Sequence, residues 1–153
     1  MKVITRRAVA RDADSIAELY LRARRAAAGV GAIPPLVHGD DDVAGWVAGV
    51  VIQSMECWVA ESAQGAIVGM LVLDGDSIDQ LYVRPDLTGR GIGAALILLA
   101  KREQPAGLRL LTFASNEGAQ RFYLRHRFRE VQRTDGTDNE EGAPDIEYAW
   151  GSD

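Results

Sequence analysis

The chain has 153 residues, of which 47% are hydrophobic and 25% charged, as in an ordinary soluble globular protein large enough to bury a core. Its net charge of −5 and its lack of a long basic run argue against a nucleic-acid binder, and no apolar run approaches the roughly 18–20 residues of a membrane span. The N-terminal segment has too few apolar residues for a signal peptide, so we expect a cytoplasmic location. The single cysteine, Cys57, excludes an internal disulfide and is expected to be a small core residue.

The first fifty residues predict one strand followed by two helices. Residues 3–7 are typical of an edge strand, and Asp12 is a candidate N-cap for a helix that Gly29 and Gly31 end. A loop with two prolines follows, and the three aspartates of residues 40–42 then favour the N-terminus of a second helix. The expected buried stripe of this helix consists of Val43, Trp46, Val47, Val50 and Val51.

The next thirty residues predict three consecutive antiparallel strands. Their expected bounds are 56–61, 66–73 and 78–83, and Asp74-Gly75-Asp76 is a strong hairpin turn between the second and the third. Pro85 ends the third strand, because it has no N–H group to donate to a neighbour.

The second half of the chain alternates between helices and strands. A helix is expected over the apolar run 94–100 and another over 116–127, and strands are expected over 108–113, 128–134 and 145–150. A polar loop, 135–144, separates the last two strands. This order indicates an α+β fold with a mixed sheet. Because no linker or repeat divides the sequence, we expect a single domain over residues 1–153.

A glycine-rich turn lies between the third predicted strand of the hairpin region and the following helix. Gly89, Gly91 and Gly93 permit a positive φ and a close approach of the backbone to a ligand. A strand, a turn and a helix in this order direct several backbone N–H groups and the positive end of a helix dipole at one point. A pyrophosphate is the expected ligand of such a turn.

The spacing of this turn distinguishes between the known phosphate-binding motifs. The chain has no Gly-Lys pair and therefore no P-loop, and Leu96 stands where a dinucleotide-binding fingerprint needs its last glycine. The segment Thr88-Gly89-Arg90-Gly91-Ile92-Gly93 instead resembles the acetyl-CoA signature of the GCN5-related N-acetyltransferase (GNAT) family, [QR]-x-x-G-x-[GA]. It departs from that signature only at Thr88.

A second stretch, residues 116–128, resembles the later signature of the same family, N-x-x-A-x-x-F-Y-x-x-x-G-F. The matching residues are Asn116, Ala119, Phe122, Tyr123 and Phe128. Arg127 stands where the family has a glycine, often in a left-handed conformation, so we expect either a modest strain there or a different turn.

The resemblance implies a GNAT-like three-layer fold, with a mixed, mostly antiparallel sheet of about seven strands flanked by about four helices. It also implies acetyl-CoA as co-substrate and no metal. The pantetheine arm would lie along the central strand, and the pyrophosphate would bind the glycine turn. The expected coenzyme-binding residues are Leu81, Tyr82, Val83, Thr88, Gly89, Arg90, Gly91, Ile92, Gly93, Ala94, Asn116, Phe122 and Tyr123.

The resemblance also suggests catalytic roles. Tyr123 matches the position that protonates the departing thiolate, and Asp79 matches a position where several members carry a carboxylate, which makes it the expected general base. In a regular strand Asp79 would share one face with Leu81 and Val83. His38, on the proline-containing loop, is the alternative base.

The acceptor is expected between the two segments 33–46 and 135–145, with His38, Trp46, Glu140, Glu141 and Asp145 as candidate contacts. Residues 135–153 hold seven acidic and no basic side chains, which favours a small cationic amine as acceptor.

We therefore predict an N-acetyltransferase that works by direct attack in a ternary complex. A protein or peptide N-terminal acetyltransferase and a non-catalytic acyl-CoA sensor are the alternatives. No nucleic acid or membrane partner is expected, and exposed edge strands make a homodimer plausible.

Overall fold

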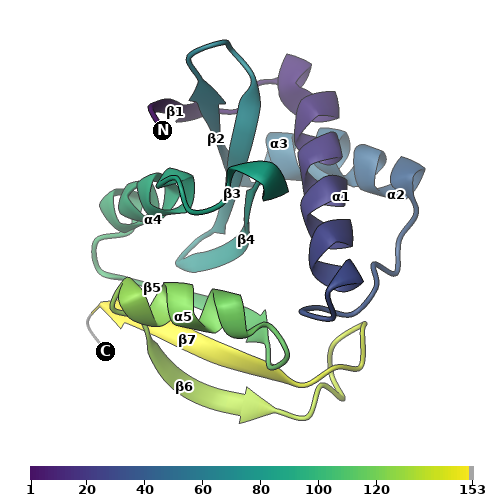
Figure 1. Cartoon of the computed structure of the whole chain (residues 1–153), viewed down its shortest axis with the longest axis vertical. Coiled ribbons are helices and arrows are strands. Elements are labelled where there is room, and N and C mark those ends of the chain that lie inside the picture. The colour runs from purple at the N-terminus through teal and green to yellow at the C-terminus, as the bar shows by residue number, and fades with distance from the viewer. Residues whose placement is uncertain (152–153) are drawn as a thin grey trace.

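The computed structural model describes residues 1–151, which form a seven-stranded sheet with helices on both faces (Figure 1). The strands are β1 (Val3–Arg7), β2 (Glu56–Ser62), β3 (Ile67–Asp74), β4 (Ser77–Val83), β5 (Gly107–Phe113), β6 (Arg129–Thr134) and β7 (Asp145–Gly151). The helices are α1 (Ala13–Gly29), α2 (Asp40–Trp46), α3 (Ile52–Ser54), α4 (Ile92–Glu103) and α5 (Glu117–Arg125), with 3-10 turns at Ala10–Asp12 and Pro85–Leu87. The α+β class and the mixed sheet are confirmed.

The sheet is divided at its centre. Its strand order is β1-β2-β3-β4-β5-β7-β6, and every neighbouring pair is antiparallel except β4 and β5, which are parallel. These two strands are paired only between Ser77 and Arg109, and beyond that point they diverge. The later part of β4 therefore has backbone N–H and C=O groups that β5 does not bond, which leaves them available to a ligand.

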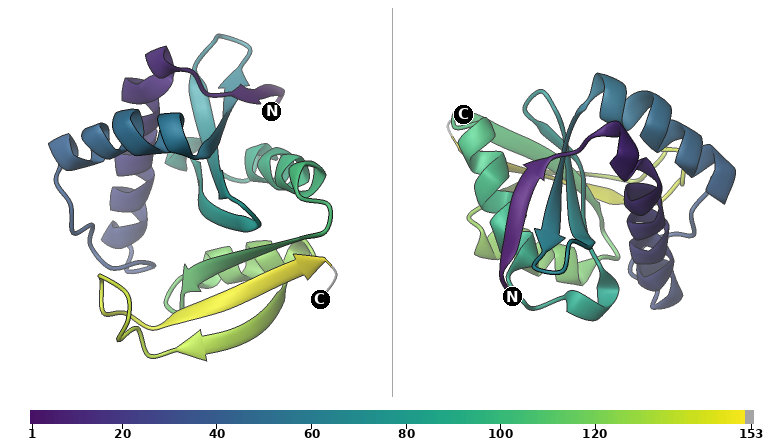
Figure 2. Two further views of the ribbon diagram at one scale, coloured as in Figure 1. Left: turned by 180° about the vertical axis from the view of Figure 1, so that it is seen from behind. Right: turned by 90° about the horizontal axis from the view of Figure 1, so that it is seen from above.

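Two hydrophobic clusters lie on opposite faces of the sheet, and the cluster beside α4 and α5 extends across both halves. Strand β3 contributes to both, because Leu71 and Leu73 face α4 and α5 whereas Met70 and Val72 face α1 and α2. Figure 2 shows the same arrangement, with α1 and α2 on one side of the sheet and α4 and α5 on the other. Cys57 is 2% exposed in the cluster on the α1 side, as expected for a core residue.

The second predicted helix differs from expectation in its middle. A π-helical segment, Val47–Val51, joins α2 to α3 and adds one residue to the turn. Val43, Val47 and Val51 are buried as predicted, but Val50 is 44% exposed, so its place in the buried stripe was wrong. Val50 instead lines a pocket together with Asp79 and Gln80 of β4.

Two predictions about the starts of helices were also wrong. Asp12 stands at the start of α1 but makes no side-chain cap to it; its carboxylate instead accepts hydrogen bonds from the Val9 N–H at 2.8 Å and from Arg6. Helix α4 begins at Ile92, two residues earlier than predicted, so the glycine turn leads directly into it. Within residues 1–151 no helix has the length and apolar character needed to cross a membrane.

Candidate functional site

A cavity of about 630 Å³ occupies the space where β4 and β5 diverge. Side chains from β4, β5, the end of α1 and the start of α5 line it. Among the predicted site residues it brings together Asp79, Leu81, Tyr82, Val83, Thr88, Asn116 and Tyr123. We call this cavity the groove.

A β-bulge at Asp79 corrects the predicted geometry of β4. Gln80 pairs with Val72 and Ile78 pairs with Leu73, so Asp79 is an extra residue without a partner on β3. Because the bulge breaks the alternation of side chains, Leu81 packs with the cluster beside α4 whereas Asp79 and Gln80 turn toward α1 and α2. The expectation that Asp79 shares a face with Leu81 and Val83 was wrong.

The bulge also changes the electrostatics of Asp79. Its partial removal from water raises the pKa of the carboxyl above its usual value, and the amide of Gln80, which donates to it at 3.3 Å, opposes this rise. A carboxylate with a raised pKa is a stronger base than an ordinary aspartate, so this environment suits proton abstraction.

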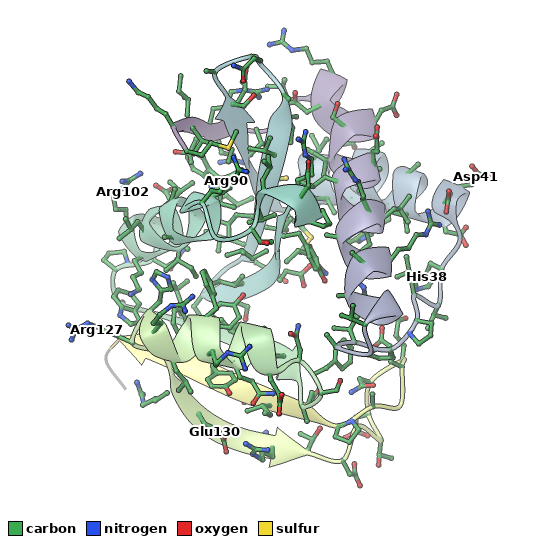
Figure 3. The ribbon with its side chains drawn as sticks, in the orientation of Figure 1. His38, Asp41, Arg90, Arg102, Arg127 and Glu130 are labelled. Carbon is green, nitrogen blue, oxygen red and sulfur yellow. The ribbon has the colours of Figure 1, made fainter. Side chains whose placement is uncertain are left out.

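The glycine turn has the conformation that its sequence predicts. Gly89 and Gly91 have φ values of +76° and +85°, and Gly91 occupies the N-cap position of α4 without any side-chain cap. The first N–H groups of α4 are therefore free to bind an anion. Figure 3 shows Arg90 on this turn. Only Thr88 of the predicted segment lines the groove itself, so the turn lies at the edge of the cavity.

Gly93 is needed for packing rather than for a turn. A Cβ atom at this position would come within 3.1 Å of the Phe122 ring. Phe122 therefore rests on the backbone of α4 and holds α5 close to it. The structure places this ring between the two helices, although Phe122 was predicted to contact the coenzyme.

Helix α5 fixes the position of Tyr123. Asn116 caps the helix by accepting a hydrogen bond from the Ala119 N–H at 3.2 Å, and Arg127 closes it with φ +69°, the left-handed conformation expected at the family's glycine position. The Tyr123 ring is 8% exposed and contacts Phe128, with 5.4 Å between ring centroids. Burial, with a further contribution from Tyr82, raises the pKa of Tyr123, so the phenol stays protonated at neutral pH.

A second cavity of about 570 Å³ lies on the other side of the bulge, toward α2. We call it the acceptor pocket. Its walls carry His38, Trp46 and Glu140, three of the five predicted acceptor contacts, together with Tyr20, Asp42, Val43, Val50, Met55, Asp79 and Gln80. The Nε2 atom of His38 lies 3.1 Å from the Glu140 carboxylate, which joins the α1–α2 loop to the β6–β7 loop. Asp79 and Gln80 line both cavities, so the two meet at the bulge.

Two predicted acceptor contacts lie outside the acceptor pocket. Glu141 points at Arg24, with 3.9 Å between Oε2 and Nη2. Asp145 is buried and accepts hydrogen bonds from Thr134 at 2.5 Å and from Asn139 at 3.2 Å, so it organises the β6–β7 loop.

Sequence reasoning missed the part that Tyr20, Asp42 and Gln80 play in the acceptor pocket. Tyr20 belongs to the apolar stripe of α1 and Asp42 to the acidic start of α2, which are the patterns of ordinary structural residues. In the part of the chain that the structure describes, no cluster of His, Cys, Asp and Glu side chains could hold a metal ion.

The sequence model of the acetyltransferase (GNAT) domain family matches residues 53–130, which is just over half of the chain. The chain belongs to this family. The matched segment contains β4 with its bulge, the glycine turn and α5.

Relatives and solved structures agree with this assignment. The chain is 35% identical over 81 residues to the peptidyl-lysine N-acetyltransferase YjaB of Salmonella typhimurium; the match covers 53% of this chain and 55% of the relative, or about half the length of each. The solution structure of apo YjaB from Escherichia coli superimposes with a TM-score of 0.78 at 23% identity and covers 99% of this chain and 100% of that one. PaiA N-acetyltransferase from Thermoplasma acidophilum, solved in complex with coenzyme A, gives a TM-score of 0.71 at 16% identity, with 99% and 100% covered. At these identities the structures show a shared fold.

Proposed function

We propose that this chain is an acetyl-CoA-dependent N-acetyltransferase that transfers the acetyl group to a cationic amine by direct attack. The observation that carries the proposal is the meeting of the groove and the acceptor pocket at the Asp79–Gln80 bulge. One cavity can hold a thioester and the other an amine, with their reactive ends side by side.

The groove fits the coenzyme in three respects. The diverging end of β4 offers unpaired backbone groups to the amides of a pantetheine arm. The uncapped N-terminus of α4 suits a pyrophosphate, since it combines free N–H groups with the positive end of the helix dipole. The relation to PaiA, whose structure contains coenzyme A, supports the same placement.

The acceptor pocket fits a cationic amine. Asp42, Asp79 and Glu140 give it negative charge, and the rings of Tyr20 and Trp46, 5.3 Å apart between centroids, give it apolar walls that suit methylene groups. A lysine side chain of a peptide has both properties. The relative YjaB is named a peptidyl-lysine N-acetyltransferase, which supports this class of acceptor.

Asp79 and Tyr123 divide the proton transfers between them. Asp79 would accept the proton that the attacking amine loses, directly or through a water, and a backbone N–H of β4 would stabilise the charge that develops on the carbonyl oxygen. Tyr123, held protonated by burial, would donate to the departing thiolate. Cys57 is buried in the cluster on the α1 side of the sheet, and burial raises the pKa of its thiol to about 11, so it is a poor nucleophile. This supports direct attack by the amine over a route through a cysteine.

A thiol-release screen tests the proposal. The chain is incubated with acetyl-CoA and, in separate reactions, polyamines, lysine-containing peptides with blocked N-termini, and peptides with free α-amines but no lysine. We expect free CoA thiol with the first two classes. Release only with free α-amines would favour an N-terminal acetyltransferase, and calorimetric binding of acetyl-CoA without any release would favour a sensor.

A further inference from the structure

One buried hydroxyl group in the wall of the groove has no hydrogen-bond partner. Thr112, on β5, is 7% exposed and lines the groove, and its Oγ1 atom has no partner among residues 1–151. A buried hydroxyl without a partner has given up its hydrogen bonds to water and gained none in return, so it destabilises the fold. Valine has a similar branched shape and would avoid this cost, so the threonine calls for an explanation.

The divergence of β4 from β5 explains why this hydroxyl is unpaired. Four successive residues of β5, Leu110 to Phe113, line the groove. Because successive side chains point to opposite faces of a strand, such a run shows that the open edge of β5 borders the cavity. Leu110, on the same face as Thr112, and Ile146, opposite it on β7, belong to the cluster beside α4, and neither side chain has a polar atom. A polar partner for the hydroxyl therefore has to come from the groove.

The place of Thr112 in the groove favours the pantetheine arm over the acetyl group as this partner. Asn116 and Tyr123 of α5 line the groove together with Thr112. The bulge at Asp79 and Gln80, where the acetyl group would react, turns toward α1 and α2, on the opposite face of the sheet. A pantetheine arm carries amide groups, and a threonine hydroxyl can donate to an amide oxygen or accept from an amide N–H.

We propose that Thr112 is a coenzyme-binding residue whose hydroxyl forms a hydrogen bond with an amide of the pantetheine arm. The hydroxyl and the methyl group both branch from Cβ, so a turn of one rotamer step, about 120°, presents the hydroxyl where the methyl group was. The coenzyme then supplies the partner that the protein alone does not. The inference rests on the proposed function, because it needs the pantetheine arm in the groove, but it holds for any acceptor amine.

Thr112→Val tests this contact, because it keeps the branched side chain and removes only the hydroxyl. Without coenzyme, the variant should melt about 2–4 °C above the parent, since an unpaired buried hydroxyl has been removed. Its Kd for CoA, measured by calorimetry, should nevertheless rise about fivefold, the middle of the range for one lost hydrogen bond. The acetyl-CoA KM should rise by a similar factor and kcat should stay nearly the same, because the arm is held equally in the ground state and the transition state.

Two further variants serve as controls. Thr112→Ser keeps the hydroxyl and loses the methyl group, so its Kd for CoA should stay within about twofold of the parent value. Thr5→Val makes the same substitution on β1, where Thr5 pairs with Ala60 and lines neither cavity. The Kd for CoA of this variant should equal that of the parent.

A comparison of ligands locates the contact on the coenzyme. In Thr112→Val the Kd should rise equally for CoA and acetyl-CoA, and it should not change for adenosine 3′,5′-bisphosphate, which has no pantetheine arm. A rise for acetyl-CoA alone would assign the hydrogen bond to the acetyl group, and a rise for the bisphosphate would assign the effect to the glycine turn. Either result would overturn the proposed contact.

The remaining outcomes separate this inference from the proposed function. An unchanged Kd for CoA in Thr112→Val would mean that no hydrogen bond to the coenzyme is lost. A lower melting temperature of this variant without coenzyme would mean that the hydroxyl already has a partner in the protein alone. Both results would overturn the role of Thr112 and leave the proposed function intact, whereas a parent chain that binds no CoA would overturn both.

Discussion

The two sides of β4 are built in different ways. On the coenzyme side, two continuous segments, 84–94 and 116–123, supply the glycine turn, the start of α4 and the face of α5 that carries Tyr123. On the acceptor side, the walls come from α1, the α1–α2 loop, α2 and the β6–β7 loop, segments that are up to 120 residues apart in the sequence, from Tyr20 to Glu140 (Figure 1). The first side is therefore encoded locally and the second only by the tertiary fold.

The two sides also differ in the groups they offer. The coenzyme side depends on backbone conformations that glycine adopts easily, such as φ +85° at Gly91. The acceptor side depends on exposed polar side chains such as His38 and Glu140. Changes to the coenzyme side should abolish the binding of acetyl-CoA, whereas changes to the acceptor side should alter the binding of the acceptor by small factors.

The largest effect is expected from Gly91→Glu. Any side chain at φ +85° is strained by roughly 1–2 kcal/mol, and a carboxylate beside the free N–H groups of α4 would repel a pyrophosphate. We expect no measurable acetyl-CoA binding by calorimetry. Gly65→Glu is the matched control, because Gly65 has φ +83° but lies in the β2–β3 turn. Retained affinity in a folded Gly91→Glu variant would remove the turn from the coenzyme site.

The next largest effect is expected from Tyr123→Phe, which keeps the packed ring and removes only the proton donor. General acid catalysis contributes about 10²–10⁴-fold in rate, and since a thiolate is a fair leaving group we expect kcat to fall by about 10²-fold. One lost hydrogen bond should weaken acetyl-CoA binding by only about 0.5–1.5 kcal/mol. Measuring kcat and the acetyl-CoA Kd on one preparation separates the two effects. If kcat falls by less than about threefold, Tyr123 is not the proton donor and serves only in packing.

Asp79→Asn should lower the activity and raise the stability of the protein at pH 7. We expect kcat to fall by about 10²-fold, the low end of the range for a lost general base. The folded-state pKa of Asp79 is raised above its unfolded value, so the charged form disfavours folding at neutral pH, and this cost disappears as the pH falls through the raised pKa. The variant should therefore melt at a higher temperature than the parent at pH 7, and the difference should shrink toward the ordinary aspartate pKa of about 3.9. Equal melting temperatures at pH 7 would contradict this account, and Asp76→Asn in the β3–β4 turn is the control.

The smallest effect is expected from Glu140→Gln. An exposed charge contributes about 0.2–1 kcal/mol, so the KM for a cationic acceptor should rise by about 1.4- to fivefold, and the acetyl-CoA Kd should not change. Glu130→Gln makes the same charge change on β6, where Glu130 pairs with Arg133 instead of facing the acceptor pocket. If both variants raise the acceptor KM equally, the effect comes from net charge and not from the acceptor pocket.

The sequence predicted what depends on local conformation. The positive φ values of the glycine turn follow from residue types and their spacing, and the left-handed Arg127 is one of the two arrangements expected at that position, because each is decided within one turn of the chain. The order of strands and helices was recovered for the same reason.

What the sequence did not predict depends on partners that are distant along the chain. The bulge at Asp79 exists only relative to the register of β3, so alternation within β4 alone gave the wrong face. Asp145 looked like part of an acidic surface, but its partners Thr134 and Asn139 bury it. Arg24 looked like one of several arginines on α1, and only the tertiary fold buries it beside Tyr20 and Glu141.

The single pairing between Ser77 and Arg109 has a consequence for the local stability of the molecule. With so few backbone bonds across the centre of the sheet, the units β1–β4 and β5–β7 are joined mainly by the side chains of the cluster beside α4, and we expect this junction to open more easily than either unit itself. A coenzyme that bonds the end of β4 and also contacts α5 would join the two units. Amide hydrogen exchange should then slow in both halves when acetyl-CoA is added, far beyond the residues that touch it.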